Sequence, residues 1–238
     1  MNMKKQTAIS EFNNSTIQYL VHDLEPALAS FQSITGLLGK GRFDPNNPLH
    51  QRLVVSCEHA LEFSRTILHD MLEYGRLQAD GFALELSELD LGQSLPEMVA
   101  IAEIQAREKN IRLQVEVAPG LPPVTTDPKI MGRIVSNLTI NSVKYAPPDS
   151  QVWVRLLNEK SGAAAITIED EGPGVEAQLL ERIFSGHFQA APQQPGAYRG
   201  VGLGLAYCWE AMRHLGGKIE ARNRKPTGLQ ILVTGFGQ

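Results

Sequence analysis

Hydrophobic residues in the first third of the chain follow the period of an α-helix. They recur at alternating three- and four-residue steps over positions 17–38 and again over 53–72, which is the spacing of one helix face. Three glycines and a proline- and asparagine-rich segment, residues 44–48, separate the two stripes and favour a loop between them. The pattern predicts two long antiparallel helices that do not fully bury each other's apolar stripes.

A second copy of the chain would complete this burial, because two such hairpins pack as a four-helix bundle. We therefore expect a homodimer. The alternative is a hairpin that packs against the remainder of its own chain.

The pattern changes after residue 81, where helix-like segments begin to alternate with segments of period two. Asp127 followed by Pro128 marks a helix start, since aspartate caps helices and proline suits the first helical position. We predict an α+β fold, with a helical hairpin over 1–87 and a domain of mixed helices and strands over 88–238. The expected helices cover 92–109, the segment after Asp127 and 203–215, and the expected strands cover 112–117, 152–157, 164–169, 218–221 and 229–234.

Composition excludes several classes of protein. With 238 residues, of which 42% are hydrophobic, the chain is large enough for a buried core. Its net charge of −4 comes from interleaved acidic and basic residues, so we expect no nucleic-acid partner. No apolar run approaches the ~20 residues of a membrane span, and no signal-peptide pattern follows Lys4 and Lys5. We expect a cytoplasmic chain without membrane contact, in which Cys57 and Cys208 are free thiols.

Three polar residues lie on one face of the helix that follows Asp127. Asn137, Asn141 and Lys144 are spaced i, i+4 and i+7 on an otherwise apolar helix. Buried amides need partners, and an amide oxygen is a suitable ligand for Mg²⁺ that is shared with substrate phosphates. Lys144 would add a positive charge beside those phosphates. The alternative for this segment alone is a helix that caps a polar loop.

Two glycine-rich turns follow later in the sequence. Asp170 ends an apolar strand and precedes Gly172 and Gly174, so backbone could approach a flat ligand while the carboxylate accepts a hydrogen bond from an amino group. The second turn, 200–205, opens a helix whose free N–H groups suit a phosphate. Its position and spacing fit neither a dinucleotide fingerprint nor a Walker loop, and the polar stretch 185–199 before it is typical of a lid.

The order of these three motifs resembles the ATP-binding domain of sensor histidine kinases, an α/β sandwich shared with ATPases of the gyrase, Hsp90 and MutL type. The resemblance implies that Asn141 ligates Mg²⁺ and that Asp170 reads the adenine amino group. Those hydrolases carry a glutamate base at the position of Asn137, so this asparagine favours phosphotransfer. The remaining ATP-binding residues implied by the resemblance are Asn137, Lys144, Tyr145, Gly172, Gly174, Phe184, Arg199, Gly200, Gly202, Leu203, Gly204 and Leu205.

His22 is the candidate phosphoacceptor. It lies on the polar side of the first predicted helix, and Asp23 could hold the imidazole tautomer and take its proton as the other nitrogen attacks phosphorus. Pro26 removes the hydrogen bond to the His22 carbonyl and bends the helix, at about 3 kcal/mol if unrelieved. The alternative is a surface histidine beside a tolerated proline. His69-Asp70 has the same dipeptide on the second helix, which we interpret as coincidence.

Residues 22–28 resemble the phosphoacceptor box of the kinase family, with Glu25 in place of a basic residue and proline one position early. In relatives with phosphatase activity the residue four after the histidine is often Thr or Asn, so Pro26 leads us to expect strong kinase and weak phosphatase activity. The resemblance implies autophosphorylation of His22 with ATP and Mg²⁺, and then transfer to a response-regulator receiver domain. A sensor module would be separate or lie outside this sequence. The alternatives are a degenerate nucleotide-binding dimer and an anti-sigma-type serine kinase.

Overall fold

The computed structural model describes residue 25 and residues 28–159, 162–185 and 202–237. Contacts divide the chain into two compact units, one of residues 1–75 with 189–203 and the other of residues 76–188 with 204–238. The predicted domain boundary between residues 87 and 88 stays a prediction.

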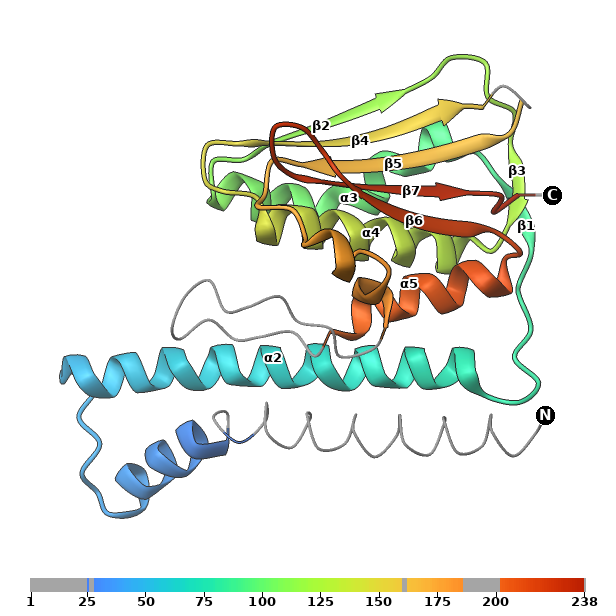
Figure 1. Cartoon of the computed structure of the whole chain (residues 1–238). Coiled ribbons are helices and arrows are strands. Elements are labelled where there is room, and N and C mark those ends of the chain that lie inside the picture. Colours follow the sequence, from blue (N-terminus) through green and yellow to red (C-terminus); the bar gives the residue numbers. More distant parts are fainter. Residues whose placement is uncertain (1–24, 26–27, 160–161, 186–201, 238) are drawn as a thin grey trace. The chain divides into compact units, whose positions relative to one another are not determined.

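The N-terminal unit is helical, as the apolar stripes predicted. A first helix is described over residues 28–39, and helix α2 spans Pro48–Gln78 (Figure 1). Asn47 begins α2, because its Oδ1 accepts a hydrogen bond from the Leu49 N–H at 2.9 Å, an arrangement that satisfies a free donor at a helix start. The turn between the helices contains the proline- and asparagine-rich segment, so the predicted loop is confirmed.

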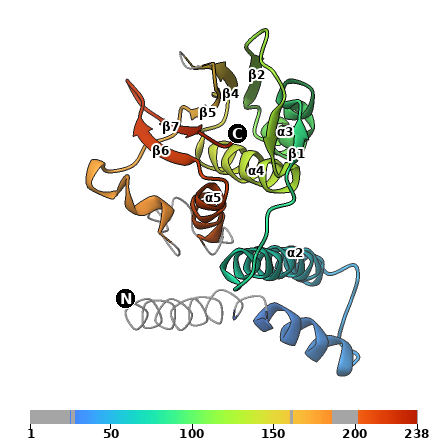
Figure 2. The same ribbon diagram turned by 90° about the vertical axis from the view of Figure 1, so that its right-hand side faces the viewer.

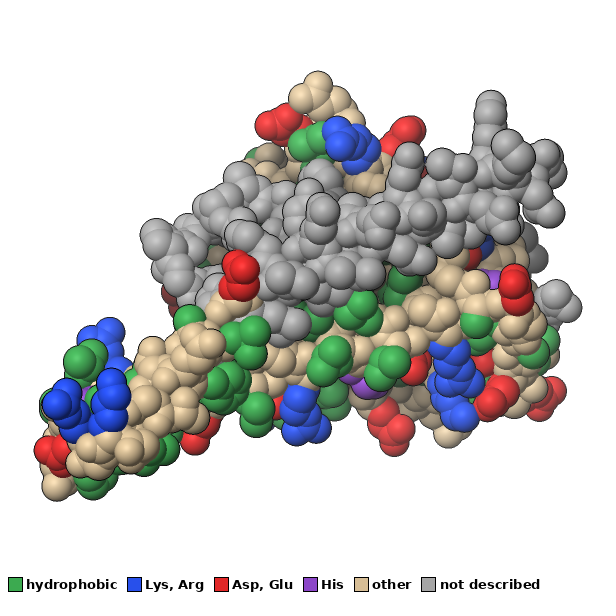
Figure 3. Space-filling model, turned by 90° about the horizontal axis from the view of Figure 1, so that it is seen from below, with side chains coloured by type: hydrophobic (Ala, Val, Ile, Leu, Met, Phe, Trp, Pro, Cys, Tyr) green, Lys and Arg blue, Asp and Glu red, His purple; other side chains and the backbone are tan. Residues whose placement is uncertain are grey.

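Helix α2 exposes much of its apolar surface. Its smaller apolar residues Cys57 and Ala60 are buried together with Ile67. By contrast, its exposed leucines have relative accessibilities between 54% and 72%; they are Leu49, Leu61, Leu68 and Leu72. Hydrophobic side chains are visible along this helical unit in Figure 3. The predicted stripe is therefore present, but only part of it is covered.

The second unit is built on a five-stranded sheet with the strand order β2-β4-β5-β7-β6. Strands β2 and β4 are parallel, and the other neighbours are antiparallel. A separate antiparallel pair joins β1 (Ser87–Leu89) to β3 (Val124–Thr126). The sheet strands are β2 (Arg112–Val117), β4 (Gln151–Asn158), β5 (Ala164–Asp170), β6 (Lys218–Asn223) and β7 (Leu229–Thr234).

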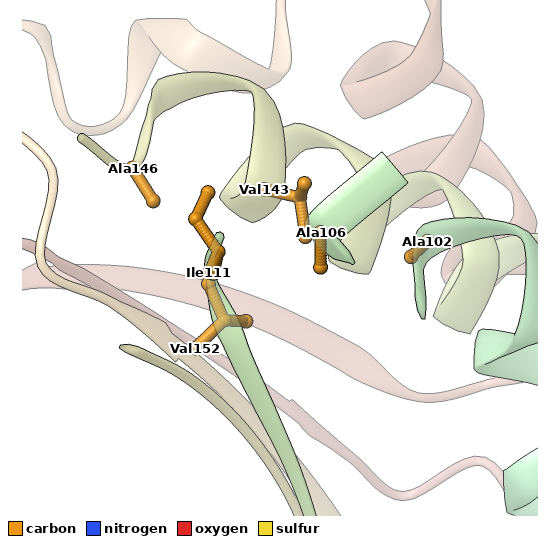
Figure 4. Close-up of a cluster of buried hydrophobic side chains, with 6 residues drawn as sticks. All are labelled: Ala102, Ala106, Ile111, Val143, Ala146 and Val152. Carbon is orange, nitrogen blue, oxygen red and sulfur yellow. The ribbon is translucent and has the colours of Figure 1, made fainter. Parts of the chain in front are cut away.

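Three helices cover one face of this sheet, α3 (Leu91–Glu108), α4 (Pro128–Tyr145) and α5 (Leu203–His214) (Figures 1 and 2). The Asp127 side chain caps α4 by accepting from the N–H groups of Lys129 and Ile130, as its position before Pro128 predicted. Small and branched residues fill the space between α3, α4 and the sheet (Figure 4); the cluster comprises Ala102, Ala106, Ile111, Val143, Ala146 and Val152. This packing fixes α4, the helix that carries the candidate asparagines.

The predicted α+β class and the longer elements of this unit are confirmed. Strands β1 and β3 and two short 3-10 helices, η1 (Ala177–Leu179) and η2 (Arg182–Phe184), were not predicted. Three residues are too few to display a period, so these elements depend on tertiary contacts. Within the part of the chain that the structure describes, no helix combines the length and the apolar character needed to cross a membrane.

Candidate functional site

The asparagine pair on α4 faces the beginning of α5. Asn137 Nδ2 donates to the Gly204 carbonyl at 3.5 Å. A Cβ atom at Gly204 would lie 3.8 Å from Asn141 Nδ2 and 3.9 Å from Asn137 Nδ2. The first of the three motifs and the second glycine turn therefore meet in space, although 67 residues separate Asn137 from Gly204.

Asp170 is the last residue of β5 and is only 4% exposed. Its Oδ1 accepts hydrogen bonds from the N–H groups of Gly172 at 2.8 Å and Leu229 at 3.2 Å. Burial raises the pKa of the Asp170 carboxyl, and these two bonds, a bond with the Ser142 side chain and the charge of Arg224 oppose that rise. Both backbone bonds fall on the same oxygen, so Oδ2 takes part in neither and could accept from a ligand.

Glycine is required at both positions of the turn after Asp170. A Cβ at Gly172 would lie 2.8 Å from Asp170 Oδ1 and 3.0 Å from the Tyr145 carbonyl. Gly174 has a φ of +73°, which side-chain-bearing residues rarely adopt, and its Cβ would lie 2.8 Å from Asn223 Oδ1. Because Gly172 has no side chain, the end of α4 at Tyr145 can lie against the Asp170 turn.

Positive charge gathers at the C-terminal end of α4. Lys109 Nζ donates to the carbonyls of Val143 at 2.8 Å and Lys144 at 2.7 Å, which satisfies terminal acceptors and complements the helix dipole. The ammonium of Lys144 lies 5.4 Å from the centroid of the Tyr145 ring. Loss of hydration lowers the pKa of Lys144, with a further contribution from Lys109, and burial raises the pKa of Tyr145.

The remaining predicted site residues divide into two groups. Phe184 is buried in η2 with Ile183, and Gly202 adopts a φ of +71° just before α5. Leu203 is buried and Leu205 is half-buried in the first turn of that helix. Four predicted residues, His22, Asp23, Arg199 and Gly200, lie outside the described residues.

Three residues beside Asp170 escaped the sequence prediction. Ser142 and the Leu229 N–H contact its carboxylate, and Asn223 holds the following turn by accepting from the Val175 N–H at 2.9 Å. Ser142 could have been found, because it directly follows Asn141. Asn223 and Leu229 could not, since their contacts depend on the order of strands in the sheet.

The donor set suits a magnesium ion that is carried by a phosphate ligand. Among the described residues, no group of three or more His, Cys, Asp or Glu side chains is placed to hold a metal. Asn141, whose amide lies beside Gly204 at the beginning of α5, carries one amide oxygen. Mg²⁺ commonly binds through one or two protein oxygens and takes its other ligands from phosphates and water, so the residues present fit that mode.

Comparison with known proteins identifies the second unit. The profile of the family described as histidine kinase-, DNA gyrase B- and HSP90-like ATPase matches residues 126–234. The adaptive-response sensory kinase SasA of Gloeothece citriformis is 25% identical over 213 residues, which are 88% of this chain and 54% of the relative. The sensor histidine kinase GlrK of Escherichia coli is 26% identical over 204 residues, which are 85% of this chain and 42% of the relative. The chain thus spans about half the length of the curated relatives it matches.

Solved structures agree on the fold. The histidine kinase ThkA in complex with the response regulator TrrA aligns with a TM-score of 0.73 at 21% identity, covering 97% of this chain and 63% of the other. Full-length ShkA in complex with AMPPNP aligns with a TM-score of 0.68 at 20% identity, covering 96% of this chain and 46% of the other. Residues 126–234 thus match the family described as histidine kinase-, DNA gyrase B- and HSP90-like ATPase, in a chain whose relatives are sensor histidine kinases.

Proposed function

We propose that this chain is the core of a two-component histidine kinase, in which ATP bound along α4 phosphorylates His22. The observation that carries the proposal is the meeting of three sequence-distant motifs: two glycine-rich turns lie against helix α4, which carries the third. Gly204 lies against Asn137 and Asn141, and the Asp170 turn lies against Tyr145. A helix that only capped a polar loop would not need this convergence of glycines and amides.

Each motif has a role in binding. The Asp170 carboxylate, with Oδ2 outside its two backbone hydrogen bonds, accepts from the adenine amino group. The N terminus of α5 offers backbone N–H groups and the positive end of its dipole to the phosphates. Asn141 would hold Mg²⁺, and Lys144 adds positive charge. Bound Mg²⁺ would neutralise charge that develops on the transferring phosphoryl group.

Phosphoryl transfer then requires positioning more than covalent chemistry on the enzyme. A ring nitrogen of His22 attacks the γ-phosphorus, the bond from phosphorus to the bridging oxygen breaks, and ADP leaves. Asp23 takes the proton from the other ring nitrogen. Asn137 cannot act as a base for water, because an amide does not accept a proton at neutral pH, and this protects the γ-phosphate from hydrolysis.

We also propose a homodimer and a receiver-domain partner. The exposed leucines of α2 support the dimer, since a second hairpin would bury them. ThkA was solved with a response regulator, which supports transfer of the phosphoryl group from His22 to an aspartate of such a domain. Location in the cytoplasm and a sensor module outside this sequence complete the proposal.

Incubation with γ-labelled ATP and Mg²⁺ tests this function against its alternatives. We expect an acid-labile label on the chain itself, because phosphohistidine hydrolyses in acid. Tight ATP binding without any label would instead identify a degenerate nucleotide-binding dimer. Acid-stable label on another protein would identify a serine kinase.

The proposed weakness of phosphatase activity rests on Pro26, which has no group to orient a water molecule. Addition of this protein and ADP to a phosphorylated receiver domain measures it. We expect little acceleration of phosphate loss, and rapid loss would contradict the proposal.

A further inference from the structure

The turn between β6 and β7 packs against Asp170 and the loop that follows it. Arg224 Nη1 donates to the Asp170 carbonyl at 2.7 Å, and the Leu229 N–H donates to Oδ1. At Gly228 a Cβ atom would lie 1.9 Å from the same carbonyl oxygen. The turn therefore contacts both the main chain and the carboxylate of Asp170, and no side chain fits at its closest point.

Arg224 is itself held in place by neighbours on the uncovered face of the sheet. Its Nε lies 3.0 Å from Glu169 Oε2, and its guanidinium lies 4.6 Å from the centroid of the Trp153 ring. Glu169 also accepts from Arg155 at 2.8 Å and from Gln230 at 2.9 Å. The Arg224 side chain is only 23% exposed, so its geometry is fixed from three directions.

Residue alternation places this network on the face opposite the helices. Val152 packs in the cluster between the sheet, α3 and α4, and successive side chains of a strand point to opposite faces. Trp153 therefore points to the uncovered face, where Glu169 is its direct partner across the ladder. Arg224 thus joins the uncovered face to the carbonyl of Asp170.

Stability alone is a poor explanation for this arrangement. Partly buried ion pairs often contribute little net stability, because the loss of hydration offsets the attraction. A guanidinium, in contrast, has several N–H groups in a rigid plane. Arg224 uses two of them on adjacent residues, Glu169 and Asp170, which fixes the direction in which the Asp170 side chain leaves the strand.

We propose that Arg224 is a positioning residue for base recognition, which holds Asp170 at the angle needed to accept from the adenine amino group. This inference rests on the proposed function, in which Asp170 reads the base. The same contacts lead us to expect an effect at Trp153. Because Arg224 lies over that ring and also bonds to Asp170, occupation of the base site changes the environment of Trp153.

Arg224→Ala is the test variant, and Arg222→Ala is its matched control. Arg222 lies two residues earlier near the end of β6, and its side chain pairs with exposed Glu220 at 2.8 Å. Affinities for ATP and for GTP, which has a carbonyl where adenine has the amino group, are measured by calorimetry on the full chain. We expect Arg224→Ala to weaken ATP binding about tenfold, as for a lost hydrogen bond to a charged group. GTP binding should be nearly unchanged, and Arg222→Ala should alter neither.

Fluorescence gives a second readout that a structural role would not move. The chain has two tryptophans, so Trp209→Phe leaves Trp153 as the only tryptophan, whose emission is read with excitation that tyrosine does not absorb. ATP should then change its emission when Arg224 is present and not when it is replaced by alanine. An equal response in both proteins contradicts the inference.

The proposal is overturned if Arg224→Ala keeps the ratio of ATP to GTP affinity, whether both affinities persist or both fall together. Should Arg224→Ala fail to fold, as judged by thermal denaturation, Arg224→Lys replaces it. Lysine cannot hold Glu169 and Asp170 with one rigid plane, so we expect its ratio of ATP to GTP affinity to be smaller than that of the wild type. An unchanged ratio overturns the proposal. Asp170→Asn tests the proposed function separately from the role of Arg224. Unchanged ATP binding in that variant contradicts recognition of the base by Asp170, whatever the result for Arg224.

Discussion

Helices α4 and α2 are both amphipathic, but they bury their apolar faces to very different extents. On α4, Ile134, Val135 and Leu138 are completely buried. On α2, Leu61 and Leu68 are each 54% exposed, and Leu72 is 72% exposed. Apolar residues with the same helical spacing are therefore buried in one unit of the chain and exposed in the other.

This difference separates two kinds of information in an apolar stripe. The stripe of α4 is covered by the sheet and by helix α3 of the same unit, so the chain alone completes its burial. The stripe of α2 predicts a surface, and its remaining leucines need a partner that the described part of the chain does not supply. We infer that the ATP-binding unit is stable as a monomer, whereas the hairpin depends on a second copy.

The largest effect is expected when charge is placed on the exposed stripe. In the double variant Leu68→Asp with Leu72→Asp, each leucine that the dimer would bury no longer contributes its roughly 2 kcal/mol of apolar burial. Each aspartate also places a carboxylate in the apolar interface, where it is unfavourable. We expect the dimer to dissociate to monomers in sedimentation analysis, with ATP affinity unchanged. Ile101→Asp, at a position of α3 that is 59% exposed, is the matched control. If it also dissociates the dimer, or if the double variant remains dimeric, α2 is not the interface.

A core substitution in α4 should have the opposite distribution of effects. Leu138→Ala removes a side chain with no exposure, which commonly destabilises a protein by about 2–5 kcal/mol. Thermal denaturation should show a lower transition temperature for the ATP-binding unit, whose transition is recognised by its shift when nucleotide is added. Sedimentation should show the same dimer as the wild type. A lost dimer would mean that the two units do not behave separately.

Within the ATP-binding unit, Asp170→Asn separates binding from folding. The asparagine Oδ1 can still accept from Gly172 and Leu229, but an NH₂ group replaces Oδ2 and would face the adenine amino group. Two opposed donors should weaken ATP binding by roughly 100-fold, the effect of an unsatisfied buried polar pair. Calorimetry measures this, and the thermal midpoint should not fall. Retained ATP affinity would remove Asp170 from the site.

The smallest predicted effect concerns pH. Since burial raises the pKa of Asp170 in the folded state, the folded chain binds that proton more tightly than the unfolded chain does. Ionisation of Asp170 therefore lowers stability as pH rises from the ordinary aspartate range through the raised pKa. Urea unfolding should show that Asp170→Asn gains stability over the wild type between acidic and neutral pH. A constant difference across this range would contradict the direction of the shift.

Periodicity and motif spacing predicted much of this molecule. The long strands and helices of the second unit, the Asp127 cap and the position of Asp170 at the end of a strand follow from local chemistry, and so sequence could identify them. The contacts of Arg224 and Leu229 with Asp170 could not be predicted, because they exist only if β7 lies between β5 and β6. Periodicity predicted that the hairpin would leave part of its apolar stripes uncovered, but it could not show which leucines of α2 are exposed. The roles of His22 and Arg199 stay predictions.

Labelling of two histidine variants tests whether ATP bound along α4 phosphorylates His22. The chain offers its own control, because His69-Asp70 on α2 repeats the dipeptide of His22-Asp23 and His69 is exposed. His22→Gln and His69→Gln are each incubated with γ-labelled ATP and Mg²⁺, and acid-labile label on the chain is counted. We expect His22→Gln to abolish the label and His69→Gln to retain it. Full labelling of His22→Gln would show that His22 is not the phosphoacceptor.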